Sequence, residues 1–476
     1  RWCNRDMVSQ ADNSNGKNAN APKRAPEKGG PKKGGRGKGD TRRVAGAMLA
    51  AITRGKTLDE ARDRLSDLPD SERNLADAMV QMALRHYGEI NALTSKHLKR
   101  ALPLRPHIAH GLLCIGVAQL VYMNVPAHAA IHETVAATGR REQPFRGLIN
   151  AVLRQIERDI QADGPPSPTP LENLPDWMQA RFEAAYGREA LDTIVTQHTR
   201  TPPLDLCFKM PEKAAAFVAA NDGAEALNDT HVRLERSGDV RALDGFKEGD
   251  WFVQDVAAGY PARLLDAELR QTSTPETPAT VLDLCAAPGG KTLQLAAAGY
   301  DVTALDISAS RLARVKENLK RTKLKANLVR GDALDWQSPK QFDAVLLDAP
   351  CSASGTMRRH PDLVLNRHEG YIAKLAEFQQ HLLKRATGWV KPGGFLCYAV
   401  CSLDPEEGEA QAQAFLAAHD DFQVVSPQNL PAHLCHEKAF RSTPADHPLA
   451  QSRYLGDIEK GGMDGFFAQV FQKTGA

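Results

Sequence analysis

The feature that most constrains the fold is a short apolar run followed by a glycine loop, at residues 281–292. Residues 281–284 (Val-Leu-Asp-Leu) are typical of a strand buried on both faces. The run breaks at residues 288–290 (Pro-Gly-Gly), and apolar residues then recur at helical spacing from Leu293. Ligands bind at the carboxyl ends of strands in open parallel sheets. The stretch therefore predicts an α/β doubly wound, Rossmann-like domain with a ligand site at this loop.

A second apolar run, residues 302–305, ends on Asp306. Asp306 lies roughly twenty residues after the first run, where nucleotide-binding folds keep an acid for the ribose hydroxyls. The loop lacks the full G-x-G-x-x-G pattern of a pyrophosphate site, and Lys291 is its only positive charge. These features favour an adenosine cofactor without phosphates. A plain tight turn between strand and helix is the alternative.

Two cysteines follow later apolar runs at the point where each predicted strand ends. Residues 342–348 predict a buried strand that leads to Cys351, and residues 395–400 predict another that leads to Cys401. Carboxyl ends of parallel strands meet at one edge of a sheet, so both thiols are expected beside the glycine loop. Two thiols, the carboxylate of Asp348 and a ribose-binding acid suggest covalent chemistry beside an adenosine cofactor. The alternative for Cys401 is an inert thiol at a strand end.

The residues after Cys401 have the pattern of a helix start. Residues 404–407 (Asp-Pro-Glu-Glu) offer an N-cap acid, a proline in the first turn and an acid three residues after the cap. They predict a helix that begins just beyond Cys401, with its positive end favouring the thiolate. The charges of Glu406 and Glu407 oppose this effect.

Three motifs carry a resemblance to a known family: Cys-Ala-Ala-Pro-Gly-Gly-Lys at residues 285–291, Asp-Ala-Pro-Cys-Ser at residues 348–352, and Cys-Ser at residues 401–402. Together they resemble the signature of S-adenosylmethionine-dependent RNA cytosine-5 methyltransferases. Among these enzymes the chain resembles the bacterial RsmB/Sun group, which methylates a cytosine of 16S ribosomal RNA. The resemblance implies S-adenosyl-L-methionine as cofactor, held by Cys285, Ala286, Ala287, Pro288, Gly289, Gly290, Lys291, Asp306, Asp332 and Asp348.

The resemblance also implies the catalytic roles. Carbon 5 of cytosine is a poor nucleophile, so a nucleophile must first add to carbon 6, and a thiolate suits this step. In the family pattern Cys401 is that nucleophile and Cys351 assists release of the methylated base. Asp348 would hydrogen-bond or protonate the ring near nitrogen 3. The family usually has Thr before its catalytic Cys-Ser; this chain has Val400, which offers no hydroxyl.

A cationic segment follows the first catalytic thiol. Arg358, Arg359 and His360 lie within ten residues of Cys351, and the family resemblance predicts that they hold RNA phosphates around the target nucleotide. The alternative is a surface loop with solvated side chains.

Composition and helical spacing divide the rest of the chain. Residues 1–40, rich in Asn, Gly, Lys and Pro, predict a disordered basic tail that is either an RNA-contacting arm or a solubilising segment. Residues 41–162 show helical spacing throughout and resemble a NusB-type RNA-binding domain. A proline-rich linker opens residues 163–275, which hold a small α/β segment, and residues 276–476 are expected to be the methyltransferase domain.

Charge and cysteine usage limit the partners. Residues 1–43 hold twelve Lys/Arg against four Asp/Glu, whereas the remainder holds 48 against 54. The body is therefore mildly acidic, and RNA affinity must come from local patches and the tail.

Eight scattered cysteines without a C-x-x-C pair predict free thiols, a reducing cytoplasm and no metal site. The longest apolar stretch, residues 108–125, contains polar residues and glycines, so no membrane span is expected.

With this resemblance, we expect a monomeric, cytoplasmic RNA cytosine-5 methyltransferase that acts on 16S ribosomal RNA before subunit assembly. The same chemistry on another RNA, such as tRNA, is one alternative. A non-catalytic RNA-binding or antitermination factor is a second, although Asp348, Cys351 and Cys401 argue against it. An NAD-dependent oxidoreductase is a third, because a glycine loop and a ribose acid are shared with that class.

Overall fold

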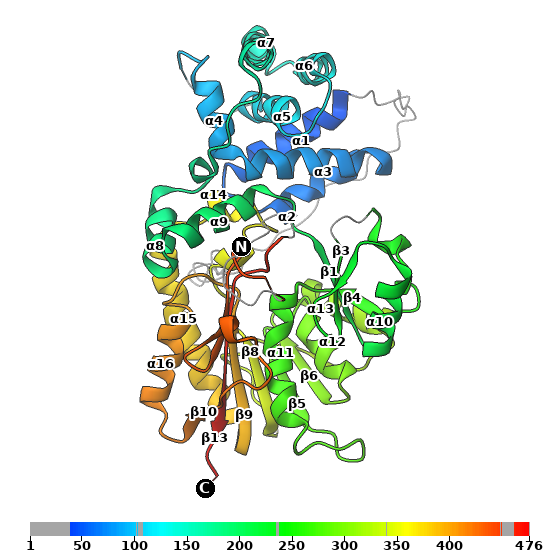
Figure 1. Ribbon diagram of the computed structural model, residues 1–476, viewed down its shortest axis with the longest axis vertical. Coiled ribbons are helices and arrows are strands. Elements are labelled where there is room, and N and C mark those ends of the chain that lie inside the picture. The colour runs from blue at the N-terminus through cyan, green and yellow to red at the C-terminus, as the bar shows by residue number, and fades with distance from the viewer. Residues whose placement is uncertain are drawn as a thin grey trace, which may run out of the picture. The chain divides into compact units, whose positions relative to one another are not determined.

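The computed structural model describes residues 39–100, 102, 108–234, 238–338, 340–447, 449 and 461–475. The predicted basic tail therefore lies outside the described residues, apart from its last two. Contacts divide the chain into two compact units, of which the second comprises Arg85–Ala92 and Ser167–Ala476. Figure 1 shows the helices and strands of both.

The first unit is helical, as the periodicity predicts. Its core forms where α1 crosses α5, and a Cβ on Gly111 would lie only 2.3 Å from the backbone oxygen of Gly46. Glycine is therefore needed for the two helices to approach this closely. No described helix is long and apolar enough to cross a membrane. The helices are α1 (Gly39–Ile52), α2 (Leu58–Ala61), α3 (Asp70–Arg85), α4 (Tyr87–Ser95), α5 (Ala109–Val121), α6 (Ala127–Ala136) and α7 (Arg146–Asp163), and the chain enters the second unit for Arg85–Ala92.

The second unit contains a small antiparallel sheet with strand order β2-β3-β1-β4. Leu206, Phe217, Val232 and Trp251 form its apolar core. The sequence indicates strands at residues 204–208 and 231–234 around a helix at 214–220; the structure has these three elements and adds two short strands. Helices α8 (Asp176–Tyr186) and α9 (Arg188–Thr199) precede β1 (Leu204–Phe208), α10 (Pro211–Ala220), β2 (Ala224–Ala226), β3 (His231–Leu234) and β4 (Trp251–Val253).

The main sheet has the order β11-β12-β13-β9-β8-β5-β6-β7, and β10 pairs with β13. Its strands β5 to β9 are parallel, and β13 is antiparallel to β9. Because β5 lies between β6 and β8, the chain reverses direction across the sheet there, and the predicted doubly wound topology is confirmed. The strands are β5 (Thr280–Leu284), β6 (Asp301–Asp306), β7 (Asn327–Arg330), β8 (Phe342–Asp348), β9 (Val390–Val400), β10 (Phe422–Val424), β11 (Cys435–His436), β12 (Ala439–Ser442) and β13 (Phe466–Lys473).

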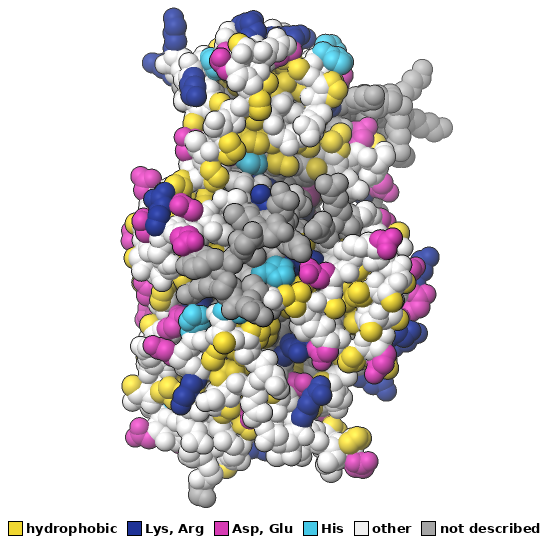
Figure 2. Space-filling model, viewed as in Figure 1, with side chains coloured by type: hydrophobic (Ala, Val, Ile, Leu, Met, Phe, Trp, Pro, Cys, Tyr) yellow, Lys and Arg dark blue, Asp and Glu magenta, His cyan; other side chains and the backbone are white. Residues whose placement is uncertain are grey.

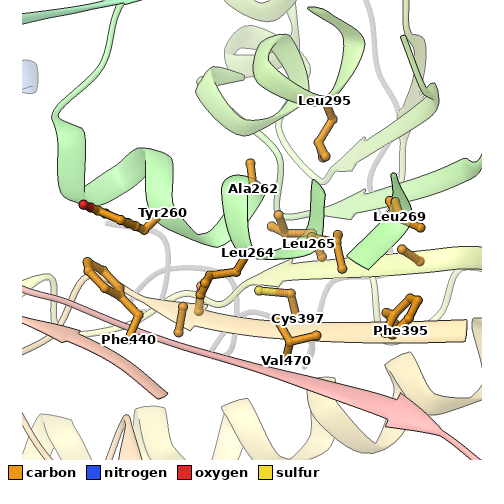
Figure 3. Packing of buried hydrophobic residues seen from close by; sticks show 14 of the residues in the cluster. Tyr260, Ala262, Leu264, Leu265, Leu269, Leu295, Phe395, Cys397, Phe440 and Val470 are labelled. Atoms are coloured by element: carbon orange, nitrogen blue, oxygen red, sulfur yellow. The ribbon is translucent and has the colours of Figure 1, made fainter. Parts of the chain in front are cut away.

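Alternate residues of the strands face two helical layers, which Figure 1 shows on opposite sides of the sheet. One layer holds α11 (Val256–Leu269), α12 (Gly290–Ala297) and α13 (Ala309–Thr322), and the other holds α15 (Gly370–Ala386) and α16 (Glu409–Ala418), with the short α14 (Leu363–Asn366) preceding α15. Cys397 faces α11, whereas its neighbours Leu396 and Tyr398 face α15 and α16. In Figure 3 Tyr260 of α11 lies against Phe440, with ring centroids 4.4 Å apart.

Strand β9 differs from the prediction in where it begins. Residues 391–394 (Lys-Pro-Gly-Gly) are expected to form a turn before a strand at Phe395, yet β9 starts at Val390. The glycines still mark an irregularity, because Gly393 has φ +78° and the register with β8 shifts between Phe342 and Ala344. The segment is therefore a distorted part of the strand.

Candidate active site

The predicted cofactor loop joins β5 to α12 at the carboxyl edge of the sheet. Gly289 has φ +103°, and a Cβ there would lie 2.9 Å from the side chain of Val315. Only glycine combines this conformation with this packing. The amide of Ala286 donates to the Leu305 oxygen at 3.1 Å, which ties the loop to the end of β6. The predicted arrangement of strand, glycine loop and helix is confirmed.

Asp306 lies at the end of β6 and holds the same loop. Its carboxylate accepts hydrogen bonds from the amides of Ala287 at 3.1 Å and Ser308 at 2.9 Å. Arg311 Nη2 lies 3.7 Å from Oδ2, and each carboxylate oxygen has a second lone pair beyond its bond to the amide. The amide of Gly331 donates to the Asp306 backbone oxygen at 3.2 Å, which places Asp332 in the neighbouring loop after β7. The acids predicted for ribose and adenine therefore lie at adjacent strand ends.

The polar atoms around the loop fit a ligand that is rich in hydrogen-bond donors. Two buried oxygens, Asp283 Oδ1 and Gln254 Oε1, have no hydrogen-bond partner among the described residues. Burial raises the pKa of Asp283 to about 7, because its charged form is desolvated. Asp306 and Asp332 add further acceptors. The ammonium group, ribose hydroxyls and adenine amine of S-adenosylmethionine match these acceptors, whereas the pyrophosphate of a dinucleotide would need donors and cations instead.

Asp348, at the end of β8, is paired with the lysine of the cofactor loop. Lys291 Nζ donates to Asp348 Oδ2 at 2.8 Å, and the lysine side chain is 8% exposed against 31% for the aspartate. Burial by itself lowers the Lys291 pKa, but Asp348 together with Asp283 and Cys401 more than offsets this, so the lysine stays charged. The structure therefore places Lys291 against a catalytic candidate as well as in the cofactor loop.

The two predicted thiols meet. Cys351 Sγ lies 3.4 Å from Cys401 Sγ, within the reach of an S–H···S hydrogen bond. The hydrogen bond to Cys401 and burial both raise the pKa of Cys351 well above its usual value, so this residue remains a thiol. The prediction that both thiols lie at one edge of the sheet is confirmed. Their separate chemical roles remain predictions.

The prediction of a helix directly after Cys401 is wrong. Helix α16 begins only at Glu409, with Gly408 as its N-cap residue. The acids expected to cap an earlier helix bind other partners: Asp404 accepts from Arg181 at 3.0 Å and from Ser354 at 2.8 Å. Glu407 is buried between the two cysteine loops. The helix end consequently lies too far along the chain to support the predicted effect on the Cys401 thiolate.

The structure also contradicts the prediction that Arg358 holds an RNA phosphate. Arg358 is 2% exposed and donates to Asp255 at 2.7 Å, Asp464 at 2.6 Å and the Gly462 oxygen at 2.8 Å. Arg359 is partly exposed but contacts the same two acids. Both guanidinium groups therefore link Asp255 to Asp464 by ion pairs inside the second unit. His360 is exposed, and its contact with RNA stays a prediction.

We expect Arg358→Ala to lower the free energy of unfolding by about 3 kcal/mol, because it removes one partner from buried charges. Urea unfolding monitors this loss. Arg314→Ala, on the exposed face of α13, should change the value by less than about 0.5 kcal/mol. Unchanged stability together with weaker RNA binding would restore the original interpretation of Arg358.

The sequence allows two interpretations of Asp255, a helix cap and, by resemblance of residues 251–255 to the family, a residue beside the active site. Its side chain accepts from the Ala257 amide at 2.8 Å, so it caps α11. The position beside the active site stays a prediction. Sequence reasoning missed Glu407 as a buried hydrogen-bond acceptor, and treated it as part of a helix cap and as an unfavourable charge.

A cavity of ≈ 340 Å³ lies elsewhere in the second unit. Side chains of α11, α12 and the small sheet line it, among them Lys209, Arg263 and Gln294. None of the predicted site residues lines this cavity, so it plays no part in the site described above.

Comparison with known proteins agrees with this geometry. Residues 271–472 match the family model described as 16S rRNA methyltransferase RsmB/F, and residues 40–158 match the NusB family model. The chain is 37% identical to ribosomal RNA small subunit methyltransferase B of Proteus mirabilis, over 79% of this chain and 92% of that protein. The Shewanella oneidensis protein of the same name is 36% identical, over 80% and 90% of the two chains.

Solved structures share the fold. The crystal structure of PH0851 has a TM-score of 0.69 at 22% identity and covers 91% of this chain and 99% of that chain. NSun6 from Pyrococcus horikoshii, solved with SFG, has a TM-score of 0.52 at 19% identity and covers 64% of this chain and 100% of that chain. The matches cover the helical unit and the doubly wound sheet alike. The chain therefore belongs to the ribosomal RNA small subunit methyltransferase B family.

Proposed function

We propose that this enzyme transfers a methyl group from S-adenosylmethionine to carbon 5 of a cytosine in 16S ribosomal RNA. The observation that carries the proposal is the pair of thiols 3.4 Å apart, beside an acceptor-rich glycine loop. An NAD-dependent oxidoreductase is disfavoured, because the loop lacks the full G-x-G-x-x-G pattern of a pyrophosphate site and its only cation, Lys291, is paired with Asp348. Family membership supports RNA as the substrate.

The first step is addition of a thiolate to the pyrimidine. Cys401 attacks carbon 6, and the electron pair of the carbon 5–carbon 6 double bond moves toward carbon 5 and the ring. Asp348 lies at the neighbouring strand end and is assigned to nitrogen 3, where charge develops. Lys291, 2.8 Å away, fixes the orientation of that carboxyl group. The bound cofactor supplies an electrophilic methyl group to carbon 5.

The second step is removal of the proton from carbon 5, followed by departure of the Cys401 sulfur with the electrons of the carbon 6–sulfur bond. We assign the base to Cys351. Its pKa is raised first by its hydrogen bond to Cys401 and also by the charge of Cys401. Both causes disappear once the Cys401 sulfur is bonded to carbon. The thiol of Cys351 therefore becomes more acidic at the stage when a base is needed, and after losing its proton to solvent the Cys351 thiolate takes the proton from carbon 5.

The RNA must offer an unstacked cytosine, because carbon 5 is inaccessible to these groups inside a stacked helix, and unstacking costs a few kcal/mol. We assign residues 41–162 to RNA binding, residues 163–275 to the linking α/β segment, and residues 276–476 to catalysis. Residues 1–40 are assigned as a basic arm. On the face drawn in Figure 2 acidic and basic side chains are interspersed, which favours local contacts over one large basic patch.

The enzyme is proposed to act as a monomer, because one chain supplies the cofactor loop and both thiols. The reaction needs Cys401 as a free thiol, and every described cysteine is free. A reducing cytoplasm, where ribosomal RNA is available before subunit assembly, meets that need.

Incubation with labelled S-adenosylmethionine tests the proposal on protein-free 16S ribosomal RNA, assembled small subunits and total tRNA. Bisulfite sequencing then locates the modified base. We expect one 5-methylcytosine in the protein-free 16S RNA and little label in assembled subunits. Label found only in tRNA would show that tRNA, and not 16S ribosomal RNA, is the substrate. No transfer to any RNA would favour a non-catalytic RNA-binding factor.

A further inference from the structure

Glu407 lies fully buried between the two loops that carry the thiols. Its carboxylate accepts from the amide of Ser352 at 2.9 Å and from the hydroxyl of Ser402 at 2.6 Å. Ser352 directly follows Cys351, and Ser402 directly follows Cys401. One side chain therefore links both cysteine loops by hydrogen bonds.

The same carboxylate is anchored to the scaffold. Gln379 of α15 donates to Glu407 Oε1 at 3.0 Å and to the Pro350 oxygen at 2.9 Å. The Tyr398 hydroxyl of β9 donates to the backbone oxygen of Glu407 at 2.6 Å. Glu407 forms no ion pair with any residue that the structure describes. A buried carboxylate held by three neutral donors requires both of its oxygens as acceptors.

We propose that Glu407 is a positioning residue that holds the Cys351 and Cys401 loops at the separation needed to release the methylated base. The inference rests on the proposed function and names a residue to which that function assigns no role. Attack on carbon 6 uses the Cys401 sulfur alone. Release requires the second sulfur to reach the proton on carbon 5 of the same adduct, so release depends on how the two loops are held.

The charge of Glu407 has a separate effect, on the pKa of Cys351. After the hydrogen bond to Cys401 and burial, the negative charges of Cys401 and Glu407 also contribute to the raised pKa of Cys351. An acid placed here therefore keeps Cys351 protonated in the free enzyme and leaves Cys401 as the attacking sulfur.

Glu407→Gln tests the proposal, because an amide has the same shape but only one acceptor oxygen. At least one of the three donors then loses its partner. We expect turnover of 16S ribosomal RNA to fall about 10-fold to 10²-fold, as displacements near 1 Å do. The KM for S-adenosylmethionine should change less than about twofold. The fraction of enzyme recovered as a covalent RNA adduct on denaturing gels should rise.

Glu406→Gln is the matched control. Glu406 is the preceding residue and has the same side chain, but this side chain is 52% exposed and pairs with Arg181. This variant should keep wild-type turnover and adduct levels. Glu407→Asp keeps the charge and shortens the reach by one methylene, so its turnover should lie between those of wild type and Glu407→Gln. Reduced turnover of Glu407→Gln without adduct accumulation would overturn the assignment to release.

A second measurement needs neither RNA nor cofactor. Diamide removes one hydrogen from each of two neighbouring thiols and joins the sulfurs, and mass spectrometry identifies the Cys351–Cys401 disulfide. We expect it to form fast in wild type and in Glu406→Gln, and at least about tenfold slower in Glu407→Gln. Equal rates would refute the positioning role. If no variant methylates RNA but the rates differ, the proposed function fails and the positioning role stands.

Discussion

Replacing Cys401 by alanine is expected to lower methyl transfer to RNA by at least about 10³-fold, because no other group can add to carbon 6. The neighbouring Cys351 is not expected to substitute for it. Removal of Cys401 eliminates the hydrogen bond between the thiols, but burial and the charge of Glu407 remain, and both raise the pKa of Cys351. Label transferred from S-adenosylmethionine to 16S ribosomal RNA measures the loss.

The control for this variant is Cys435→Ala. Cys435 is a free, partly buried cysteine on β11 and is no part of the proposed site, so its replacement should leave activity unchanged. Binding of S-adenosylmethionine by Cys401→Ala should also match wild type, because the loop at residues 285–291 is intact. Full methylation by Cys401→Ala, or a covalent RNA adduct formed without this sulfur, would show that the thiols are assigned wrongly.

The sheet and its ligand edge could be predicted because local patterns determine them. An apolar run of strand length, a glycine loop and an acid at the next strand end are each readable within a few residues. Cys351 and Cys401 could be placed together because parallel strands bring their carboxyl ends to one edge. Their separation of 3.4 Å follows from the pairing of β8 with β9, which the order of the strands does not reveal.

Side-chain partners distant in the sequence could not be predicted. Arg358 has the composition of a phosphate contact, and its burial depends on Asp255 and Asp464, each more than 100 residues away. Residues 404–407 fit a helix start locally, yet the acids bind Ser352, Ser354 and Arg181 instead. At residues 404–407 tertiary hydrogen bonds replace the predicted local ones, and at Arg358 they replace the predicted contact with RNA.

The resembled family usually has Thr at the position of Val400. Packing explains why an apolar side chain fits there. The Val400 side chain is fully buried and belongs to the apolar cluster between the sheet and the layer of α15 and α16. Cys401, one residue later, contacts the cluster on the opposite face. A side chain at position 400 therefore points away from the thiol and supports it only through the backbone of β9.

Replacing Cys351 by alanine should have the opposite signature to loss of Cys401. Attack on carbon 6 and methyl transfer remain possible, because Cys401, Asp348 and Lys291 are untouched. The proton on carbon 5 then has no base within reach, so the carbon 6–sulfur bond persists. Loss of a general base slows such a step about 10²-fold to 10⁴-fold. We therefore expect one round of methylation per enzyme and a stable protein–RNA adduct.

A denaturing gel with labelled RNA and a count of methyl groups per enzyme measure both parts of this expectation. The double variant Cys351→Ala/Cys401→Ala is the decisive control, because it lacks the sulfur to which RNA would be bonded and must show no adduct. The two single variants then separate the roles of sulfurs that lie 3.4 Å apart. Repeated turnover by Cys351→Ala would mean that another group removes the proton, and Asp348, the remaining carboxylate at the ends of β8 and β9, would become the candidate base.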